Sequence, residues 1–438
     1  MEWPRLLSSK RFRDDTPPRA EDGRSQFQKD YDRIVFSRAF RRLQGKTQVH
    51  PLRDNDHVHT RLTHTLEVAS VGRSLGARAG LRLKQDHKLP ESMHPQDVGS
   101  ILQAACLAHD IGNPPFGHAG ENAIRGWFKQ HHDYLDDLSD NQQKLDLENF
   151  EGNAQGLRVL SQLEGHLFSG GLRPTFTTLG TFIKYPWSSG HASIIQKSKF
   201  GFFQTENSII EEIATELGLI KTSSVSWTRH PLVFLTEAAD DICYAIIDLE
   251  DALEVGILGF HEVESILSIG LDGTERQEYG TIASEDMPRR LNFLRGKVVD
   301  YLVSQAIGAF FENEQSILAG NFAGDLITHC EKNARKIVTR AKSLASDKVF
   351  RDSRKTEIEI GAYSIMDVLL KAFCDACLEL KKSQLSFRSQ RVFDLLGVNA
   401  PGKDETLYSC LVRMTDFVSG STDKFAVRLS RRLSGFDF

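Results

Sequence analysis

The chain has 438 residues, of which 40% are hydrophobic and 26% charged, the ordinary balance of a globular protein. This length is compatible with two or three domains or with one large domain. The formal net charge of −5 argues against a dedicated nucleic-acid-binding protein. The sequence has no apolar run of about 18 residues and no early apolar stretch typical of a signal peptide. We therefore expect a cytoplasmic protein with no membrane partner.

The cysteines suggest neither a disulfide framework nor a metal site. They are scattered and mostly fall within helical patterns, which favours reduced, buried thiols. Cys374 and Cys377 form a single CxxC pair, whereas a structural zinc site needs further ligands. The six are Cys106, Cys243, Cys330, Cys374, Cys377 and Cys410.

Taken in chain order, the predicted elements are mostly helices. Residues 8–32 are charge-rich with little periodicity, so we expect them on the surface, at least at their start. From Tyr31 to Leu43 apolar residues recur three and four positions apart, which predicts a helix. Pro114 and Pro115 must break the chain after the third helix. Further helices are expected at 61–79, 95–109, 118–128, 150–163, 208–217, 231–255, 288–312, 325–345, 363–380 and 405–419, a loop or weak helix at 131–148, and extended pieces at 47–51, 173–187 and 197–203.

These patterns predict an all-α fold with little strand. We expect a helical core from about residue 60 to 255, followed by further helices. The sequence contains no fixed-period repeat and no low-complexity tract. Residues 256–400 hold no motif that indicates a function.

His109 and Asp110 are adjacent at the end of an apolar helix, directly before Gly112. Neighbouring side chains lie about 100° apart on a helix, but at a helix end the chain turns and both can reach one metal. Imidazole nitrogen with carboxylate oxygen suits Mn, Fe, Zn, Ni or Mg. The alternative is a histidine near the negative end of the helix dipole and an aspartate that starts a turn.

Two other polar residues lie on helices that look buried. His64 lies within RLTHTLEVASV, where the alternative is a hydrogen-bonded core histidine. Asp240, Tyr244 and Asp248 are four residues apart and share one stripe of an apolar helix. Buried carboxylates are costly unless they are paired or bound to metal, although a solvated polar stripe is the alternative. In chain order, the four candidate metal ligands follow the pattern H…HD…D: His64, His109, Asp110 and Asp240.

Several stretches together resemble the bacterial deoxyguanosine triphosphate triphosphohydrolase family of the HD superfamily. The resemblance covers about residues 37–255 and touches the C-terminal part; LAHDIGNPPFGHAGEN (107–122) is its most specific stretch. It implies an HD-domain helical core with additional C-terminal helices. The expected division is an N-terminal segment at 1–58, a metal-dependent core at 59–255, and a helical region at 256–438 that completes the fold and contributes oligomer contacts. The other stretches are SRAFRRLQGKTQV (37–49), HTRLTHTLEV (59–68), TFIKYPW (181–187), EAADDICYAIIDLEDA (237–252) and DFVSGSTDKFA (416–426).

The resemblance implies a divalent metal, which could be Mg, Mn, Co, Ni, Fe or Zn. Asp241 is the rival to Asp240 as a ligand. We prefer Asp240 because its helical register carries Tyr244 and Asp248, and we expect Asp241 to be a structural partner of the ligands. The implied ligands are His64, His109, Asp110 and Asp240.

His118 and Glu121 are three residues apart, share a helix face and can hydrogen-bond. The alternative is a histidine at a helix start with a capping-turn glutamate. The resemblance implies that this pair is catalytic and performs the acid–base work. Arg61 and Lys184 are expected to bind the phosphates, although both could be solvated surface cations. The implied substrate-binding residues are Gln48, Val49, Arg61, Lys184, Tyr185, Tyr244 and Asp248, with Tyr244 under the sugar, where a 2′ hydroxyl would clash.

The implied activity is hydrolysis of dGTP, or of other deoxynucleoside triphosphates, to deoxynucleoside and inorganic triphosphate. Another HD-type nucleotide phosphohydrolase or phosphodiesterase is one alternative, which would not need His118, Glu121 or the IKYPW segment. A non-catalytic sensor of nucleotides or single-stranded DNA is a second alternative. The resemblance also implies a homo-oligomer, commonly a hexamer, and a response to nucleotide or single-stranded DNA effectors.

Overall fold

The computed structural model describes residues 1–13, 23–48, 58–165, 171–191, 198–349 and 353–436. Within these ranges nearly all regular structure is helical, and one two-stranded antiparallel sheet pairs β1 (Lys221–Ser223) with β2 (Ser226–Trp227). The expected all-α fold is therefore confirmed. Among the described helices, none has the length and apolarity needed to cross a membrane.

Two long helices lie side by side at the centre of the molecule: α4 (Arg61–Gln85) and α5 (Pro95–Ala108). Glycines on α4 permit the close approach. A Cβ atom at Gly80 would lie 2.2 Å from the carbonyl oxygen of Pro95, and one at Gly76 would lie 2.5 Å from that of Val98. Larger residues at these positions would push the helices apart.

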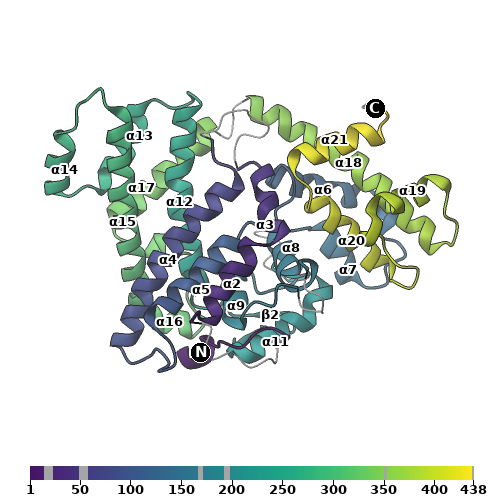
Figure 1. Ribbon diagram of the computed structural model, residues 1–438, viewed down its shortest axis with the longest axis horizontal. Helices are drawn as coiled ribbons and strands as arrows, with labels where there is room; N and C mark the ends of the chain where they lie inside the picture. Colours follow the sequence, from purple (N-terminus) through teal and green to yellow (C-terminus); the bar gives the residue numbers. More distant parts are fainter. Residues whose placement is uncertain (14–22, 49–57, 166–170, 192–197, 350–352, 437–438) are drawn as a thin grey trace.

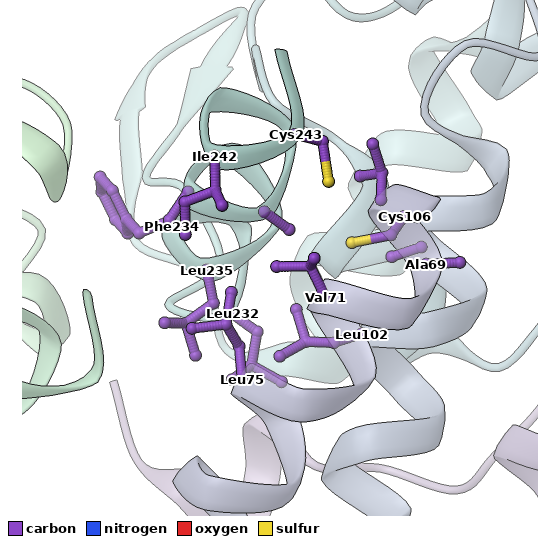
Figure 2. Packing of buried hydrophobic residues seen from close by; sticks show 14 of the residues in the cluster. Ala69, Val71, Leu75, Leu102, Cys106, Leu232, Phe234, Leu235, Ile242 and Cys243 are labelled. Carbon is purple, nitrogen blue, oxygen red and sulfur yellow. The ribbon is translucent and has the colours of Figure 1, made fainter. Parts of the chain in front are cut away.

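A third helix, α12 (Val233–Glu254), packs against α4 and α5 through an apolar layer (Figure 2). The layer is buried, and burial of apolar surface stabilises a fold by about 25 cal/mol per Å². Because α12 comes from a distant part of the chain, this packing brings residues near 240 beside residues near 64 and 109. The labelled members include Val71, Leu75, Leu102, Cys106, Leu232, Leu235 and Ile242.

Shorter helices cover this centre. α2 (Gln26–Val35) packs on α5, and α3 (Arg38–Arg42) leads toward the start of α4. α6 (His118–Gln130) follows the turn after α5. The remaining short helices of this half are α1 (Trp3–Leu6), α7 (Asn141–Glu148), α8 (Gly152–Arg158), α9 (Phe176–Phe182) and α11 (Asn207–Leu217).

The C-terminal half flanks the centre from two sides (Figure 1). One group packs into the same core as α4 and α12. The other packs with α6 around a second buried cluster. The first group is α13 (Phe260–Leu267), α14 (Gly273–Gly280), α15 (Met287–Glu312), α16 (Glu314–Leu318) and α17 (Lys332–Leu344); the second is α18 (Ser353–Lys381), α19 (Phe387–Leu396), α20 (Leu407–Ser419) and α21 (Asp423–Leu433).

Some expected elements differ from the structure. The segment 173–187, expected to carry extended pieces, has isolated β-bridges at Thr175 and Trp187. Between them it contains α9, because Thr175 caps a helix by accepting a hydrogen bond from the backbone N–H of Thr178. The helix expected at 150–163 is shorter and ends in a π-helical turn, Val159–Leu163. α17 starts only at Lys332 rather than 325. The six cysteines are free and buried, as expected.

Candidate active site

Three of the expected metal ligands converge where α4, α5 and α12 meet. His64 Nε2 lies 3.2 Å from Asp240 Oδ1, and His109 Nε2 lies 3.5 Å from the same oxygen. Ligand atoms of all three residues lie within 4.8 Å of one another. The α12 packing described above therefore joins two histidines and a carboxylate that are up to 176 residues apart.

The hydrogen bonds of His109 leave one nitrogen available to a cation. Its Nδ1 lies 2.7 Å from the carbonyl oxygen of Cys106 and so donates its hydrogen there. When the ring is neutral, as a metal ligand requires, the lone pair is then on Nε2, which faces Asp240. Burial by itself would raise the pKa of Asp240, but the charge of His109 and a hydrogen bond with His64 hold it below its usual range. Two imidazoles and an ionised carboxylate are a donor set that fits a divalent transition metal.

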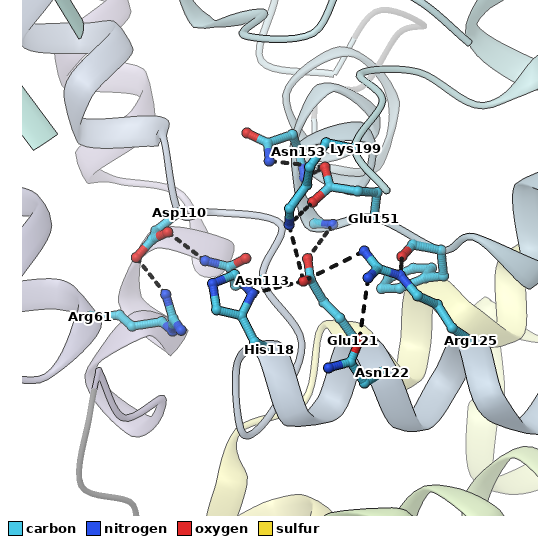
Figure 3. Close-up of polar contacts among 12 residues, drawn as sticks. Arg61, Asp110, Asn113, His118, Glu121, Asn122, Arg125, Glu151, Asn153 and Lys199 are labelled. Atoms are coloured by element: carbon cyan, nitrogen blue, oxygen red, sulfur yellow. Dashed lines mark hydrogen bonds and ion pairs between the residues drawn. The ribbon is translucent and has the colours of Figure 1, made fainter. Parts of the chain in front are cut away.

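Asp110 lies at the edge of this cluster. Its Oδ1 is 3.6 Å from His109 Nε2. It also accepts hydrogen bonds from the Arg61 guanidinium at 2.6 Å and from the Asn113 side chain at 2.5 Å (Figure 3). Burial would raise the pKa of Asp110, but the charges of Arg61 and His109 lower it to about 2. Asp110 is thus an anion beside the cluster, with both oxygens engaged.

The structure separates the two adjacent aspartates of α12. Asp240 faces the histidines, whereas Asp241 Oδ1 forms an ion pair with Lys342 Nζ of α17 at 2.7 Å. This placement favours Asp240 as the ligand and gives Asp241 a partner outside the cluster.

His118 and Glu121 form a close pair at the start of α6 (Figure 3). His118 Nδ1 lies 2.9 Å from Glu121 Oε2, and the His118 side chain is 79% exposed whereas that of Glu121 is 2% exposed. Glu121 Oε1 also accepts a hydrogen bond from the backbone N–H of Gly152 at 2.8 Å. The hydrogen bond from Gly152 therefore fixes the buried Glu121 carboxylate, while the His118 ring remains accessible to solvent.

The Glu121 carboxylate is held as an anion by neighbouring cations. Burial by itself would raise the pKa of Glu121, but the hydrogen bond with His118 and the charge of Lys199 bring it well below its usual range. Lys199 Nζ lies 3.3 Å from Glu121 and 2.5 Å from the buried Glu151. These contacts run to the side chains of His118 and Lys199 and to the backbone of Gly152, and Glu121 does not cap the backbone at the start of α6.

One cavity of about 400 Å³ joins the ligand cluster and the histidine pair. That volume is within the range of small-molecule sites. Three residues of α18, a helix to which the sequence assigned no function, complete its wall. The lining residues among those expected are Gln48, Arg61, His64, His109, Asp110, His118, Lys184, Tyr185, Asp240 and Tyr244, and those from α18 are Lys355, Ile358 and Glu359.

The two expected phosphate-binding cations lie in this wall and are mostly buried. Arg61 is 6% exposed and binds Asp110. Lys184 Nζ lies 3.4 Å from Glu237 Oε1. Burial alone would lower the pKa of Lys184, but the neighbouring Tyr185 and Glu237 raise it above its usual range. Lys184 therefore keeps its charge beside the ligand cluster.

Of the other residues expected to bind substrate, some line the cavity and some do not. Gln48 lines the cavity, and its side-chain oxygen is buried without a hydrogen-bond partner among the described residues. Val49 lies outside the described residues. Tyr244 lines the cavity, whereas Asp248 is 2% exposed and is not among the lining residues. Burial and then the charge of Asp248 raise the pKa of Tyr244, so the two side chains interact one turn apart on α12.

Some residues of the site were missed by sequence reasoning. Asn113, which orients Asp110, lay inside the GNPPFG stretch, and its amide beside a carboxylate candidate was an available signal. Lys199 lies 78 residues from Glu121 in a stretch without periodicity. No local pattern could have linked it to the site.

Two histidines and an aspartate from three helices thus converge beside the His118–Glu121 pair. This arrangement indicates the class of protein to which the chain belongs. Residues 61–181 match the HD domain family model, and the protein is a metal-dependent phosphohydrolase of the HD superfamily. The match includes His64, His109 and His118, whereas Asp240 lies beyond it and is brought in by α12.

Full-length comparisons define the family within that class. The chain is 50% identical, over 99% of both sequences, to a deoxyguanosinetriphosphate triphosphohydrolase-like protein of Pseudomonas aeruginosa. It is 39% identical to a protein of the same description from Synechocystis, over 99% of both. It is also 32% identical to the deoxyguanosinetriphosphate triphosphohydrolase of Salmonella paratyphi A, over 79% of this chain and 76% of that protein. The chain belongs to the deoxyguanosinetriphosphate triphosphohydrolase-like family.

Proposed function

We propose that the protein hydrolyses deoxynucleoside triphosphates, dGTP among them, to deoxynucleoside and inorganic triphosphate. The observation that carries the proposal is the shared cavity. An accessible His118, held by a buried Glu121, lines the same wall as the His64, His109 and Asp240 cluster. A monophosphatase of the same superfamily would need the cluster alone. The names of the relatives support a nucleoside triphosphate as the substrate class.

The ligand cluster suits a divalent cation, and His64, His109 and Asp240 would hold it with Asp110 beside them. Bound there, Mg, Mn, Co, Ni, Fe or Zn would supply a Lewis acid that polarises a phosphate oxygen and lowers the pKa of a bound water. The donor set of two imidazoles and carboxylates favours a transition metal over Mg or Ca.

In the proposed reaction a water attacks the α-phosphorus, its oxygen becomes an oxygen of the triphosphate, one of its protons passes to solvent, and the bond from phosphorus to O5′ breaks. O5′ takes the electron pair of that bond and needs a proton, because an alkoxide is a poor leaving group. His118 donates this proton. Its Nδ1 faces Glu121, so Nε2 is the nitrogen that can face O5′. The products are the deoxynucleoside with a free 5′ hydroxyl and intact triphosphate.

The remaining cavity residues serve the substrate. A triphosphate carries about four negative charges, and Arg61 and Lys184 provide cations close to the ligand cluster. Tyr244 leaves little room for a 2′ hydroxyl. We place the sugar and base near Gln48 and Tyr185, which both line the cavity, with Val49 next to Gln48 in sequence. Asp248, which contacts Tyr244 but does not line the cavity, then acts on the sugar through Tyr244.

The resemblance also supports a homo-oligomer, such as a hexamer, in the cytoplasm, with nucleotides or single-stranded DNA as effectors. Light scattering of the purified protein, with and without these effectors, tests that part separately.

The activity is tested by a screen of the four deoxynucleoside triphosphates and GTP in Mn, Mg and Co, with chromatographic identification of products. We expect deoxynucleoside and triphosphate from at least dGTP. An Asp240→Ala variant is the control for contaminating phosphatases. Orthophosphate as the sole inorganic product would instead indicate a different HD phosphohydrolase.

A further inference from the structure

Asp423, at the start of α21, joins two distant segments of the chain. It is 1% exposed. Its Oδ2 accepts hydrogen bonds from the backbone N–H of Thr47 at 3.1 Å and from the Thr47 hydroxyl at 2.9 Å. Its Oδ1 accepts one from the backbone N–H of Phe116 at 3.0 Å. One carboxylate thus serves donors that lie 376 and 307 residues away.

Both partners of Asp423 line the active-site cavity. Thr47 directly precedes Gln48, on the side where we place the sugar and base. Phe116 lies two residues before His118 and has a φ of 62°, a left-handed conformation that a bulky residue rarely adopts. Such a conformation persists only where surrounding contacts hold it, and the bond to Asp423 is one of these contacts.

Two hydrogen bonds of Lys46 connect the turn between α20 and α21, directly before Asp423, to the site. Lys46 is 3% exposed, and its Nζ donates to the carbonyl oxygen of Asn113 at 2.5 Å and to that of Ser419 at 2.7 Å. The side chain of Asn113 in turn donates to Asp110. The turn between α20 and α21 is therefore connected both to the segment at 46–47 and to the loop that follows His109.

We propose that Asp423 is a positioning residue for the reaction. It touches neither the expected substrate nor the ligand cluster, but it sets the wall at Thr47 and Gln48 relative to the turn that carries His118. The proposal rests on the proposed function, since the distance between acid and sugar matters only if the 5′ oxygen is the group that His118 protonates. A misplacement of about 1 Å can cost about a hundredfold in rate.

The chain offers a matched control in Asp30 of α2. Asp30 is also 1% exposed, and its Oδ2 accepts from the backbone N–H of Thr175 at 3.0 Å and from the Thr175 hydroxyl at 2.7 Å. Its other oxygen binds Arg11 at 2.7 Å. Neither Asp30 nor Thr175 lines the active-site cavity. Loss of this carboxylate should affect stability as much as loss of Asp423, without affecting the site.

The experiment compares Asp423→Asn and Thr47→Val with Asp30→Asn. For each variant we would measure kcat and KM for dGTP at a temperature where it is folded, bound metal, and amide hydrogen exchange of peptides that contain residues 47 and 116. We expect Asp423→Asn to lose about tenfold to a hundredfold in kcat/KM with metal content unchanged, and to exchange faster at both peptides. Thr47→Val should mainly raise KM. The double variant Thr47→Val/Asp423→Asn should have nearly the same kcat/KM as Asp423→Asn alone. Asp30→Asn should change kcat/KM less than about threefold.

Equal losses in Asp423→Asn and Asp30→Asn, or unchanged exchange at residues 47 and 116, would overturn the positioning role. If Asp423→Asn does not fold, Thr47→Val decides, and wild-type KM in that variant would overturn the proposal. Failure of the proposed function looks different, because the wild type would then release no triphosphate from any deoxynucleoside triphosphate. The exchange measurement would still decide whether Asp423 holds the two segments.

Discussion

His118 Nδ1 and Glu121 Oε2 lie 2.9 Å apart, and the two side chains differ sharply in exposure, at 79% and 2%. A buried carboxylate fixes the ring of an accessible histidine at the edge of a cavity that also contains the ligand cluster. This pair distinguishes the site from one that has metal ligands alone, because His118 can donate a proton.

Removal of His118 should slow the chemical step and leave the metal in place. His118→Ala is expected to lose about 10²–10⁴ in kcat, the usual contribution of general acid–base catalysis. The matched control is His132→Ala, since His132 is also exposed (66%) and lies 3.3 Å from a glutamate, Glu148, but does not line the cavity. Steady-state kinetics and metal analysis check this. Wild-type kcat in His118→Ala would assign His118 a structural role.

Glu121 should make folding stability depend on pH in a defined direction. The pKa of Glu121 lies well below its ordinary value in the folded protein, despite burial, because of His118 and Lys199. Its contribution is therefore fully present above the unfolded pKa of about 4.3 and is lost as pH falls. Glu121→Gln should lower the free energy of unfolding by about 1–3 kcal/mol near pH 7, and the difference should shrink below about pH 5.

Urea unfolding of the wild type and Glu121→Gln between pH 4 and 8 measures this difference. Glu148→Gln is the control, because it alters the other His–Glu pair. A difference that grows on acidification would contradict the assignment of Glu121 as a buried anion.

The two aspartates of α12 should separate clearly by mutation. Asp240→Ala removes the oxygen that lies within 3.5 Å of both histidines, so metal content and turnover should both be lost. Asp241→Ala removes only the ion pair with Lys342 and should retain stoichiometric metal and most of the activity, while it lowers folding stability by about 0–1 kcal/mol, the usual contribution of a partly exposed ion pair. Metal analysis of the purified variants decides. Full metal in Asp240→Ala would sink the ligand assignment.

Sugar discrimination should depend on Tyr244 and Asp248. We expect dGTP to be cleaved far faster than GTP, and a 2′,3′-dideoxy analogue to be poor. Tyr244→Ala should narrow the gap between dGTP and GTP. Asp248 does not line the cavity but contacts Tyr244, so Asp248→Ala should narrow the same gap by a smaller factor. Comparable wild-type rates on the two nucleotides would contradict the role of Tyr244.

Local pattern was sufficient for the long core helices α4, α5 and α12 and for the direction of several residues on them. The spacing of four along α12 placed Asp240 and Tyr244 on one stripe, and both line the cavity. The same spacing also suggested that Asp248 faces the sugar, but the structure buries it behind Tyr244. Spacing on a helix gives direction around its axis, whereas the depth of the cavity depends on what packs against that helix.

Long-range contacts were beyond the reach of sequence. Lys199 meets Glu121 across 78 residues, and Asp423 meets Thr47 across 376. The stretch 416–426 resembles the family in sequence, but its contact with the turn before α6 arises only from the packing of α21. Such bonds depend on tertiary packing and leave no periodic trace in the chain.

The most direct test of the central claim is the fate of dGTP in water labelled with ¹⁸O. The account predicts one deoxyguanosine and one intact inorganic triphosphate per turnover, with a single ¹⁸O atom in the triphosphate, because water attacks phosphorus and O5′ leaves. Release of dGMP with pyrophosphate, or of dGDP with orthophosphate, would contradict it, as would ¹⁸O in the 5′ hydroxyl of the nucleoside.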